Sequence, residues 1–556
     1  MNEMDSIGAA LTAPGGPFET VVEDVLGARL PVFRSRRRSL RELLEASSHQ
    51  GDLEYLVFGE RRISYREHYR TVLELARVLE RQYGIGKGDR VAIFAGNCPE
   101  WILSFWATVS LGGIVVGMNG WWAADEARYA LADSEPKVLI ADRKRLDRIR
   151  AEPPRARVIE IESEFDALMK MAGDGALPGV PIEEDDPAVI LYTSGTTGRP
   201  KGAVSTHRNI LALLGLQSFH GARLAALAQS RGVALPRTQH VRLNAAPLFH
   251  VSGLYSAAVA QLASGMKSVW MTGRFDPKTV LELIEKERIN GWGPLGSMAI
   301  RVASHPDRAR YDLSSMQSIG CGGAPVTVAI QEKLREAFPN ARSGLGVGYG
   351  LTECTGLATI IAGDELEQHP GSVGKPLPTV EVVIRDEDGC AAPEGEEGEI
   401  TIRSPLVMKE YWRNPQATAA SVGPDRFLRT GDVGYFRDGR LHIATRKRDM
   451  ILRAAENVYP IEIENRLAAH PAVLEAAAVG VDHPELGQEV KAFVVFRPDQ
   501  AVPFDALARF VSEALAYYKV PSVWEARREP LPRNASGKVM KWLLEPGVEN
   551  PLAHDE

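Results

Sequence analysis

The stretch from Thr193 to Lys201, within LYTSGTTGRPKGA (residues 191–203), places four hydroxyl side chains, two glycines and a lysine close together. Free backbone N–H groups and hydroxyls can close around an anion, and a lysine can neutralise its charge. The stretch therefore predicts a phosphate-binding loop that consists of Thr193, Ser194, Gly195, Thr196, Thr197, Gly198 and Lys201.

This loop differs from the common nucleotide-binding loop, in which Gly-Lys-Ser/Thr opens a helix. Pro200 stands where the hydrogen bonding of a helix would have to begin. The flanking segments AVILYTS and KGAVSTH both have the residue pattern of strands. We therefore expect a flap between two strands that folds over a triphosphate and then releases it. An ordinary glycine turn is the alternative.

The elements that must position this loop are predicted from length and composition. A chain of 556 residues is too long for one compact core, so we expect two to four domains. The net charge of -7 argues against nonspecific binding to nucleic acid. The 4 cysteines have no CxxC spacing, which favours a reducing compartment, and we expect a cytoplasmic protein.

Three further features of the sequence bear on other functions. The 12 histidines include no HExxH pattern, so no transition-metal site is predicted. The first residues, MNEMDSIGAA, lack the charged and apolar regions of a secretory signal. The basic cluster FRSRRRSL runs into Ser39 and Glu42, which have capping-box spacing, and this pattern favours a solvated turn before a helix.

The uncharged segment 101–122 is long enough to span a membrane. However, Pro99 and Glu100 predict the start of a helix that Gly112 and Gly113 would end, and IVVGMN then has the pattern of a short buried strand. We expect strand, helix and strand within an α/β layer and no membrane span.

The alternation of strand and helix patterns continues along the chain and predicts largely parallel sheets covered by helices. After about residue 375 the pattern becomes that of a small β-rich subdomain, and the last hundred or so residues have an α+β pattern. The fold class expected is multidomain α/β, with a large N-terminal domain (1–445, including the β-rich part at about 375–445) and a small mobile C-terminal domain (446–556).

Several motifs occur together in the order of one family. They are YTSGTTGRPKG, APLFHVSGL (246–254), GGAP (322–325), GYGLTE (348–353), RTGDVGYFRDGRL (429–441), RKRDMI and PRNASGK (532–538). With them, residues 50 to 545 resemble the acyl- and aryl-CoA synthetase branch of the adenylate-forming superfamily. The resemblance implies an N-terminal AMP-binding domain and a C-terminal domain that takes two orientations.

The resemblance also implies site residues, and their chemistry fits these roles. Tyr349 can stack on adenine between Gly348 and Gly350, and Asp432 can accept both ribose hydroxyls. The remaining residues are Thr352 for the α-phosphate, Glu353 and Thr196 for Mg²⁺, Arg446 near the ribose, Lys538 at the carboxylate–phosphate junction, His250 at the acyl site, and Gly323, Ala324 and Pro325 near adenine.

The reaction implied is attack of a carboxylate on the α-phosphorus of ATP, which expels pyrophosphate, followed by transfer of the acyl group to CoA with release of AMP. Two residues depart from the family's pattern. Thr445 replaces a common glycine, and Ala454-Ala455 stands where relatives usually have glycine near the pantetheine path. The hinge of the family matches Arg448, and Arg is compatible with that role.

The acid itself is less closely specified. His250, Val251, Gly322, Gly323 and Gly346 lie on segments that line the family's acyl pocket, and small residues there leave room for an extended or bulky acid. We expect a medium- or long-chain fatty acid, with an aryl or steroid-side-chain acid as the alternative. A carrier-protein thiol is the alternative acceptor, and a nucleotide-binding protein without catalysis is a third hypothesis. A monomer or homodimer is expected.

Overall fold

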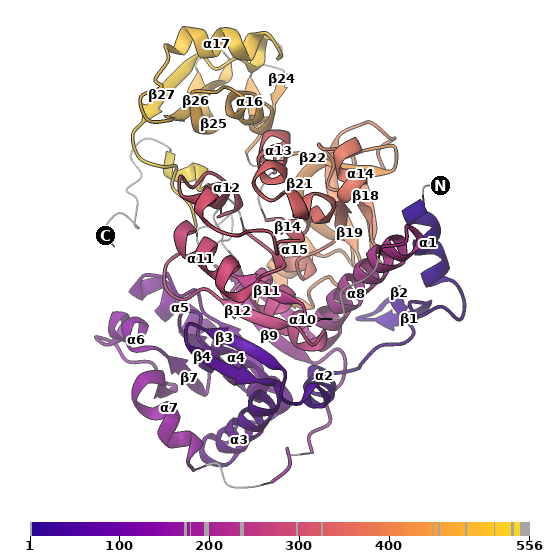
Figure 1. The fold of residues 1–556 in the computed structure, drawn as a ribbon, viewed down its shortest axis with the longest axis vertical. Coiled ribbons are helices and arrows are strands. Elements are labelled where there is room, and N and C mark those ends of the chain that lie inside the picture. The colour runs from indigo at the N-terminus through magenta and orange to yellow at the C-terminus, as the bar shows by residue number, and fades with distance from the viewer. Residues whose placement is uncertain are drawn as a thin grey trace.

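The computed structural model describes residues 3–171, 175–177, 179–193, 200–233, 238–295, 298–323, 326–446, 449–453, 456–483, 486–515, 517–534 and 539–544. In Figure 1 the C-terminal part of the chain, drawn in yellow, lies above a larger body that contains the rest. The large N-terminal part consists of layered α/β sheets and the C-terminal part is a small α+β unit, as the sequence predicts. The exact domain boundaries and the mobility of the small domain stay predictions.

The first large sheet carries the strands that flank the phosphate loop. Its neighbours are parallel over most of its width, as the Val- and Ile-rich strand patterns predict, and antiparallel only at the phosphate-loop end. In order across the described sheet, the strands are β20 (Glu410–Tyr411), β10 (Lys201–Thr206), β9 (Pro187–Thr193), β6 (Ile114–Gly117), β5 (Arg90–Phe94), β7 (Val138–Ala141) and β8 (Arg157–Glu160).

The second large sheet is parallel in its centre and antiparallel at both edges. One of its faces packs against helices through a core that includes Leu243, Trp292 and Ile319. In order across the described sheet, the strands are β17 (Lys375–Pro376), β16 (Thr359–Ala362), β15 (Leu345–Tyr349), β14 (Ser318–Cys321), β13 (Gly291–Trp292), β11 (Val241–Asn244), β12 (Lys267–Trp270), β3 (Glu54–Phe58) and β4 (Arg61–Ser64).

Helices cover these sheets, and their ends follow the local sequence. The predicted amphipathic helix α11, for example, is capped by Asp276, starts at Pro277 and buries Val280, Leu281 and Ile284. The described helices of the body are α1 (Glu3–Thr12), α2 (Leu40–Ser47), α3 (Tyr65–Tyr83), α4 (Pro99–Ser110), α5 (Ala124–Ser134), α6 (Arg143–Ile149), α7 (Ile161–Met169), α8 (His207–Ser230), α9 (Val251–Gly253), α10 (Ala260–Ala263), α11 (Pro277–Glu287), α12 (Met298–Ala303), α13 (Val328–Ala337), α14 (Gly363–Gln368) and α15 (Pro415–Ser421).

Smaller sheets complete the fold, and the predicted β-rich segment forms one that is antiparallel. Its order is β18 (Glu381–Arg385), β19 (Gly398–Arg403), β21 (Leu428–Arg437) and β22 (Arg440–Arg446). An N-terminal hairpin consists of β1 (Thr20–Val25) and β2 (Ala28–Phe33). The C-terminal unit contains β23 (Ile451–Arg453), β24 (Glu456–Val458), β25 (Val473–His483), β26 (Gly487–Phe496), β27 (Val523–Arg527), α16 (Pro460–Ala468) and α17 (Phe504–Ser512).

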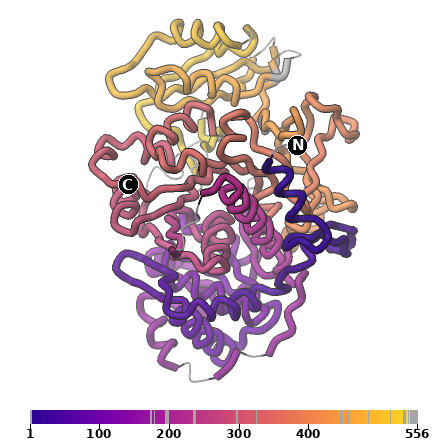
Figure 2. The backbone as a smooth tube through the Cα atoms, turned by 45° about the vertical axis from the view of Figure 1, so that its right-hand side comes forward, coloured from indigo at the N-terminus to yellow at the C-terminus, as the bar shows by residue number. Residues whose placement is uncertain are grey.

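The uncharged segment 101–122 folds as predicted: α4 begins at Pro99, the chain turns at Gly112 and Gly113, and β6 follows. Among the described residues, one helix, α8, is long and apolar enough to cross a membrane. Helix α1 packs beside α8, as Figure 2 shows. Several side chains of α8 are buried in the core. The expectation of no membrane span stays a prediction.

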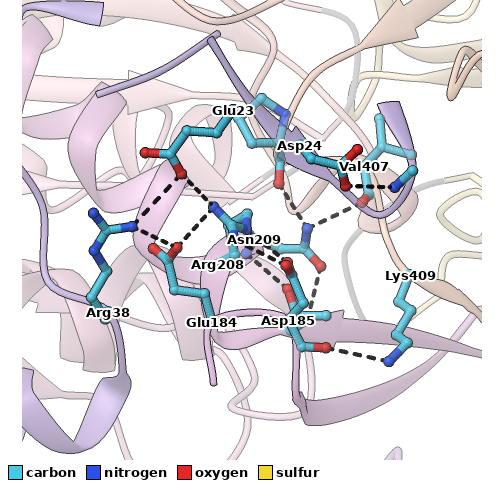
Figure 3. A network of polar contacts seen from close by, with 12 residues as sticks. Glu23, Asp24, Arg38, Glu184, Asp185, Arg208, Asn209, Val407 and Lys409 are labelled. Atoms are coloured by element: carbon cyan, nitrogen blue, oxygen red, sulfur yellow. Dashed lines mark hydrogen bonds and ion pairs between the residues drawn. The ribbon is translucent and has the colours of Figure 1, made fainter. Parts of the chain in front are cut away.

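The basic cluster before α2 was expected to be solvated, and for one residue this expectation is wrong. The Arg36 side chain is only 10% exposed and pairs with Glu23 and Glu184. Figure 3 shows Arg38 and Arg208 directed at the same two carboxylates. Glu23 belongs to β1 and Glu184 to the segment before β9. The ion pairs of Arg36 and Arg38 therefore connect the N-terminal hairpin to the first large sheet. The predicted cap is present, because Ser39 accepts from the Glu42 backbone N–H.

Candidate active site

One cleft of about 3150 Å³ joins the segments that the sequence analysis singled out. Its walls come from both large sheets, from β21 of the β-rich sheet and from the C-terminal unit. The predicted site residues Thr193, Lys201, His250, Gly323, Gly348, Tyr349, Gly350, Thr352, Glu353 and Asp432 all line it. The carboxyl ends of parallel strands are where open α/β sheets usually bind ligands.

The two ends of the phosphate loop meet at the cleft. Thr193 ends β9 and Lys201 begins β10, and the two residues are paired in an antiparallel register, which confirms the expected strand–loop–strand arrangement. The Lys201 ammonium lies 5.3 Å from the centre of the Tyr411 ring. Ser194, Gly195, Thr196, Thr197 and Gly198 lie outside the described residues, so their phosphate contacts stay predictions.

Glu353 is held at the cleft by two hydroxyl groups. Its Oε1 accepts a hydrogen bond from Tyr411 Oη at 2.9 Å and one from Thr193 Oγ1 at 3.2 Å. No cationic side chain of the described residues forms an ion pair with Glu353, so its negative charge stays available. A hard carboxylate oxygen positioned by neutral donors fits a Mg²⁺ ligand. Thr352 precedes it at the start of a short turn of helix, η5 (Thr352–Cys354), and also lines the cleft.

The predicted adenine and ribose residues contact each other. Tyr349 Oη donates to Asp432 Oδ2 at 2.8 Å, although the two residues come from different sheets. Burial, reinforced by the Asp432 carboxylate, raises the pKa of Tyr349 well above its ordinary value, so the phenol stays protonated. Gly350 has to be glycine, because a Cβ there would lie 2.5 Å from the Gly356 backbone. Gly323 has φ +74°, a conformation that also favours glycine.

Arg446 pairs directly with Asp432 across β21 and β22. This register places its backbone beside the predicted ribose ligand, while its side chain is outside what the structure describes. Ala324, Pro325 and Lys538 also lie outside the described residues. Arg533 and Val539 form an antiparallel bridge on either side of the Lys538 segment, and both line the cleft.

His250 caps the short helix α9 at the wall of the cleft. Its Nδ1 lies 2.7 Å from Ser252 Oγ. Burial lowers the pKa of His250 to about 4, so the imidazole is neutral at pH 7 and can bind only as a neutral polar group. This position agrees with the predicted border of the acyl site, but the role of His250 stays a prediction.

Two cleft residues were not predicted from the sequence. Tyr411 contacts both Lys201 and Glu353. In the sequence it is a single tyrosine in the short strand β20, with no neighbouring pattern that indicates a site residue. Arg242 of β11 also lines the cleft, and its Nη1 donates to Ser318 Oγ. A single arginine in the strand pattern VRLN gives no sign of where its side chain lies.

A large α/β body and a small α+β unit that share a cleft, with Thr193 and Lys201 at the ends of the glycine-rich segment lining it, fit the class of adenylate-forming enzymes. A family model described as AMP-binding enzyme matches residues 43–412, and one described as AMP-binding enzyme C-terminal domain matches 462–538. The chain therefore belongs to the AMP-binding enzyme family.

The relatives of the chain are acyl- and aryl-CoA ligases. It is 32% identical to a long-chain-fatty-acid–CoA ligase of Bacillus subtilis (91% of this chain, 94% of the relative). It is 34% identical to a feruloyl-CoA synthase of Amycolatopsis (87% and 93%). It is similar in structure to o-succinylbenzoate CoA synthetase from Bacillus subtilis in complex with its acyl-adenylate intermediate, with TM-score 0.76 and 28% identity over 92% of this chain and 98% of that chain.

Proposed function

We propose that this protein is an acyl-CoA synthetase that activates a carboxylic acid with ATP and transfers the acyl group to CoA. A carboxylate oxygen attacks the α-phosphorus, the bond to the bridging oxygen breaks, and pyrophosphate leaves. The thiol of CoA then attacks the acyl carbon, and AMP leaves. The observation that carries the proposal is the convergence of Thr193, Glu353 and the Tyr349–Asp432 pair on one cleft.

Different residues of the cleft would bind the nucleoside, the phosphates, the metal ion and the reacting carboxylate in the first step. Tyr349 and Asp432 would hold the nucleoside, while Thr352 and the phosphate loop would position the phosphates. Glu353, with Thr196, would hold Mg²⁺, which when bound neutralises phosphate charge. Lys538 would meet the charge that develops at the carboxylate–phosphate junction. In the second step the C-terminal domain would turn and withdraw Lys538.

The acid we propose is a medium- or long-chain fatty acid. The names of the relatives include both fatty-acid and feruloyl ligases, so an aryl acid is the second candidate. Gly320, Gly322 and Gly346, which line the same cleft as His250, support a long acyl path, because side chains at these positions would project into it. A steroid-side-chain acid is a variant of the same proposal.

CoA is the proposed acceptor, and a carrier-protein thiol is the alternative. Ala454 and Ala455, which motivate that alternative, lie outside the described residues between β23 and β24. A nucleotide-binding protein without catalysis is disfavoured by the intact Glu353, Asp432 and Lys538. A cytoplasmic location and a monomer or homodimer complete the proposal, and the structure shows all four cysteines free.

The experiment that tests the proposal is a panel of fatty, aryl and steroid-side-chain acids assayed for AMP release with ATP and Mg²⁺. Each acid is run with CoA, with a holo-carrier protein and with neither thiol. Thioester formed with CoA supports the proposal. AMP release with the carrier alone supports the alternative acceptor, and no acid-dependent AMP release with any acceptor would refute both.

A further inference from the structure

Arg242 is a cation inside the cleft without an anionic partner among the described residues. Its Nη1 donates to Ser318 Oγ at 2.8 Å, and no described carboxylate lies within ion-pair distance of the guanidinium. Burial lowers the pKa of Arg242 to about 10, which still leaves it protonated at pH 7. An arginine carries five N–H donors, and a neutral serine oxygen satisfies little of that capacity.

The position of Arg242 along the strands places it at the far end of the acyl path. Side chains alternate faces along a strand, and Leu243 packs into the core on one face of the second sheet. Arg242 and Asn244 therefore point to the other face, where Asn244 exchanges hydrogen bonds with Gln261. This face, which lies toward the cleft, is the one that carries the glycines of the predicted acyl pocket.

Between the proposed nucleotide site and Arg242, most residues on that face of β14 and β15 are glycines, which have no side chain. Gly322 and Gly348 are neighbours across β14 and β15 at the end nearest the nucleotide site. Two residues earlier in each strand, Gly320 pairs with Gly346. Two residues before Gly320, Ser318 aligns with Arg242 through Gly291, which lies between them. A Cβ at Gly320 would meet nothing within 4 Å. Four residues of strand, from Gly322 to Ser318, span about 13 Å. The path is open and ends at a guanidinium.

The neighbouring strand makes room for this arginine. A Cβ at Gly291 would lie 2.1 Å from Arg242 Nη1 and 2.7 Å from Cζ. The Arg242 side chain therefore lies directly over the Gly291 backbone, and this glycine lets it reach Ser318. A larger side chain at position 291 would displace the guanidinium from this position.

From this arrangement we propose that the acid substrate carries a second carboxylate at its distal end, which Arg242 binds. The inference rests on the proposed acyl-CoA synthetase activity, and within the proposed fatty-acid class it replaces the methyl terminus by a carboxylate. Arg242 is half-buried and its one described side-chain partner is a neutral hydroxyl, so a carboxylate that can accept two parallel N–H bonds would be a stronger partner for the guanidinium. A methyl terminus would bury apolar carbon against the guanidinium and would leave its N–H groups unpaired.

The test compares acids matched in length that differ only at the distal end: hexanoate with adipate, octanoate with suberate, decanoate with sebacate, and dodecanoate with dodecanedioate. The readout is kcat/KM from acid-dependent pyrophosphate release. In the wild type, one length is expected to favour the diacid by roughly 10- to 150-fold, the range that follows from a hydrogen-bonded charge. Arg242→Met should abolish this preference and improve the monoacid, while Arg242→Lys should retain part of it.

The matched control is Arg301→Gln, because Arg301 also lines the cleft but is exposed, with its guanidinium over the Phe275 ring. It should leave the diacid preference unchanged. Thermal unfolding of Arg242→Met verifies folding, and replacing a half-buried cation that has no described ion-pair partner by an apolar side chain of similar length should change the melting temperature little. A wild type that prefers the monoacid at every length, or an unchanged ratio in Arg242→Met, would overturn the inference and leave the synthetase activity standing. Absence of pyrophosphate release with every acid would instead refute the proposed function, and the inference with it.

Discussion

Tyr349 and Asp432 share a hydrogen bond of 2.8 Å across two sheets of the protein. Tyr349 ends β15 of the second large sheet, and Asp432 lies in β21 of the β-rich sheet. Asp432 is almost fully buried, with an exposed fraction of 6%. The nucleoside site we propose is therefore preorganised by a contact within the protein itself.

Removal of the Tyr349 hydroxyl tests this preorganisation. In Tyr349→Phe the ring can still stack, but Asp432 loses a donor that helps to orient it. We expect the KM for ATP to rise roughly 12-fold, which corresponds to about 1.5 kcal/mol, the lower end for a hydrogen bond to a charged group, with kcat little changed. Tyr349→Ala, which also loses the ring, should raise KM further. Steady-state kinetics with varied ATP measure both, and equal KM values in wild type and Tyr349→Phe would mean that the contact does not orient Asp432.

Glu353 is expected to control the response to magnesium. Glu353→Gln replaces a hard anionic ligand by a neutral amide, so turnover at limiting Mg²⁺ should fall by at least tenfold, while binding of the carboxylic acid changes little. Tyr411→Phe is the matched control, since it removes one hydroxyl from Glu353 Oε1 and keeps the charge. Its effect should be much smaller. Titration of activity with Mg²⁺ checks both, and a Mg²⁺ dependence of Glu353→Gln like that of the wild type would remove Glu353 from this role.

The alanine pair at 454 and 455 predicts which half-reaction is slower. If a methyl group narrows the pantetheine path, acyl-adenylate should accumulate, and Ala455→Gly should speed thioester formation severalfold with adenylation unchanged. Glycine can cost roughly 0.5–1 kcal/mol of local order, so a slightly lower melting temperature is expected. Single-turnover measurements of pyrophosphate and thioester check this. No accumulated adenylate, with an equal thioester rate in the glycine variant, would show the pair to be neutral.

Stability should fall at acid pH because of buried histidines, and His68 is the clearest case. It is fully buried, its ring meets Tyr55 edge-on at 4.9 Å, and neither ring nitrogen has a hydrogen-bond partner among the described groups. Burial lowers the pKa of His68 from 6.5 to about 3. Between these values the unfolded chain binds a proton that the native chain does not, so the free energy of unfolding falls as pH falls, by about 1.4 kcal/mol per pH unit for one such group.

His68→Leu should therefore weaken the pH dependence of unfolding between pH 6.5 and 3. Urea unfolding at several pH values measures this slope, and the exposed His49→Gln is the control that should leave it unchanged. A His68→Leu protein with the same slope as the wild type would show that this histidine is not kept neutral by the fold.

The parts predicted from sequence are those that depend on neighbours in the chain. The strands on either side of the phosphate loop, the helix from Pro99 and the cap at Ser39 follow from local patterns, and the structure contains each of them. Turn glycines and capping residues act over a few positions, so their signal lies in the sequence itself.

The parts that were missed depend on residues far apart in the chain. Arg36 was expected in solvent because its partner Glu184 is 148 positions away. Tyr411 gave no signal because its contact with Glu353 spans 58 positions. Arg242 is set apart only by its neighbours across the sheet, Gly291 and Ser318. Such contacts exist only once the sheets have formed.

The central claim, acyl-adenylate formation on this cleft, is tested most directly by acid-dependent exchange of labelled pyrophosphate into ATP without CoA. Exchange reports the reversible first step alone. We predict exchange that requires the acid and Mg²⁺, that needs no thiol, and that Lys538→Ala abolishes while the variant still forms thioester from supplied acyl-adenylate. No exchange with any acid of the panel, or acid-dependent release of ADP and phosphate in place of AMP and pyrophosphate, would contradict the account.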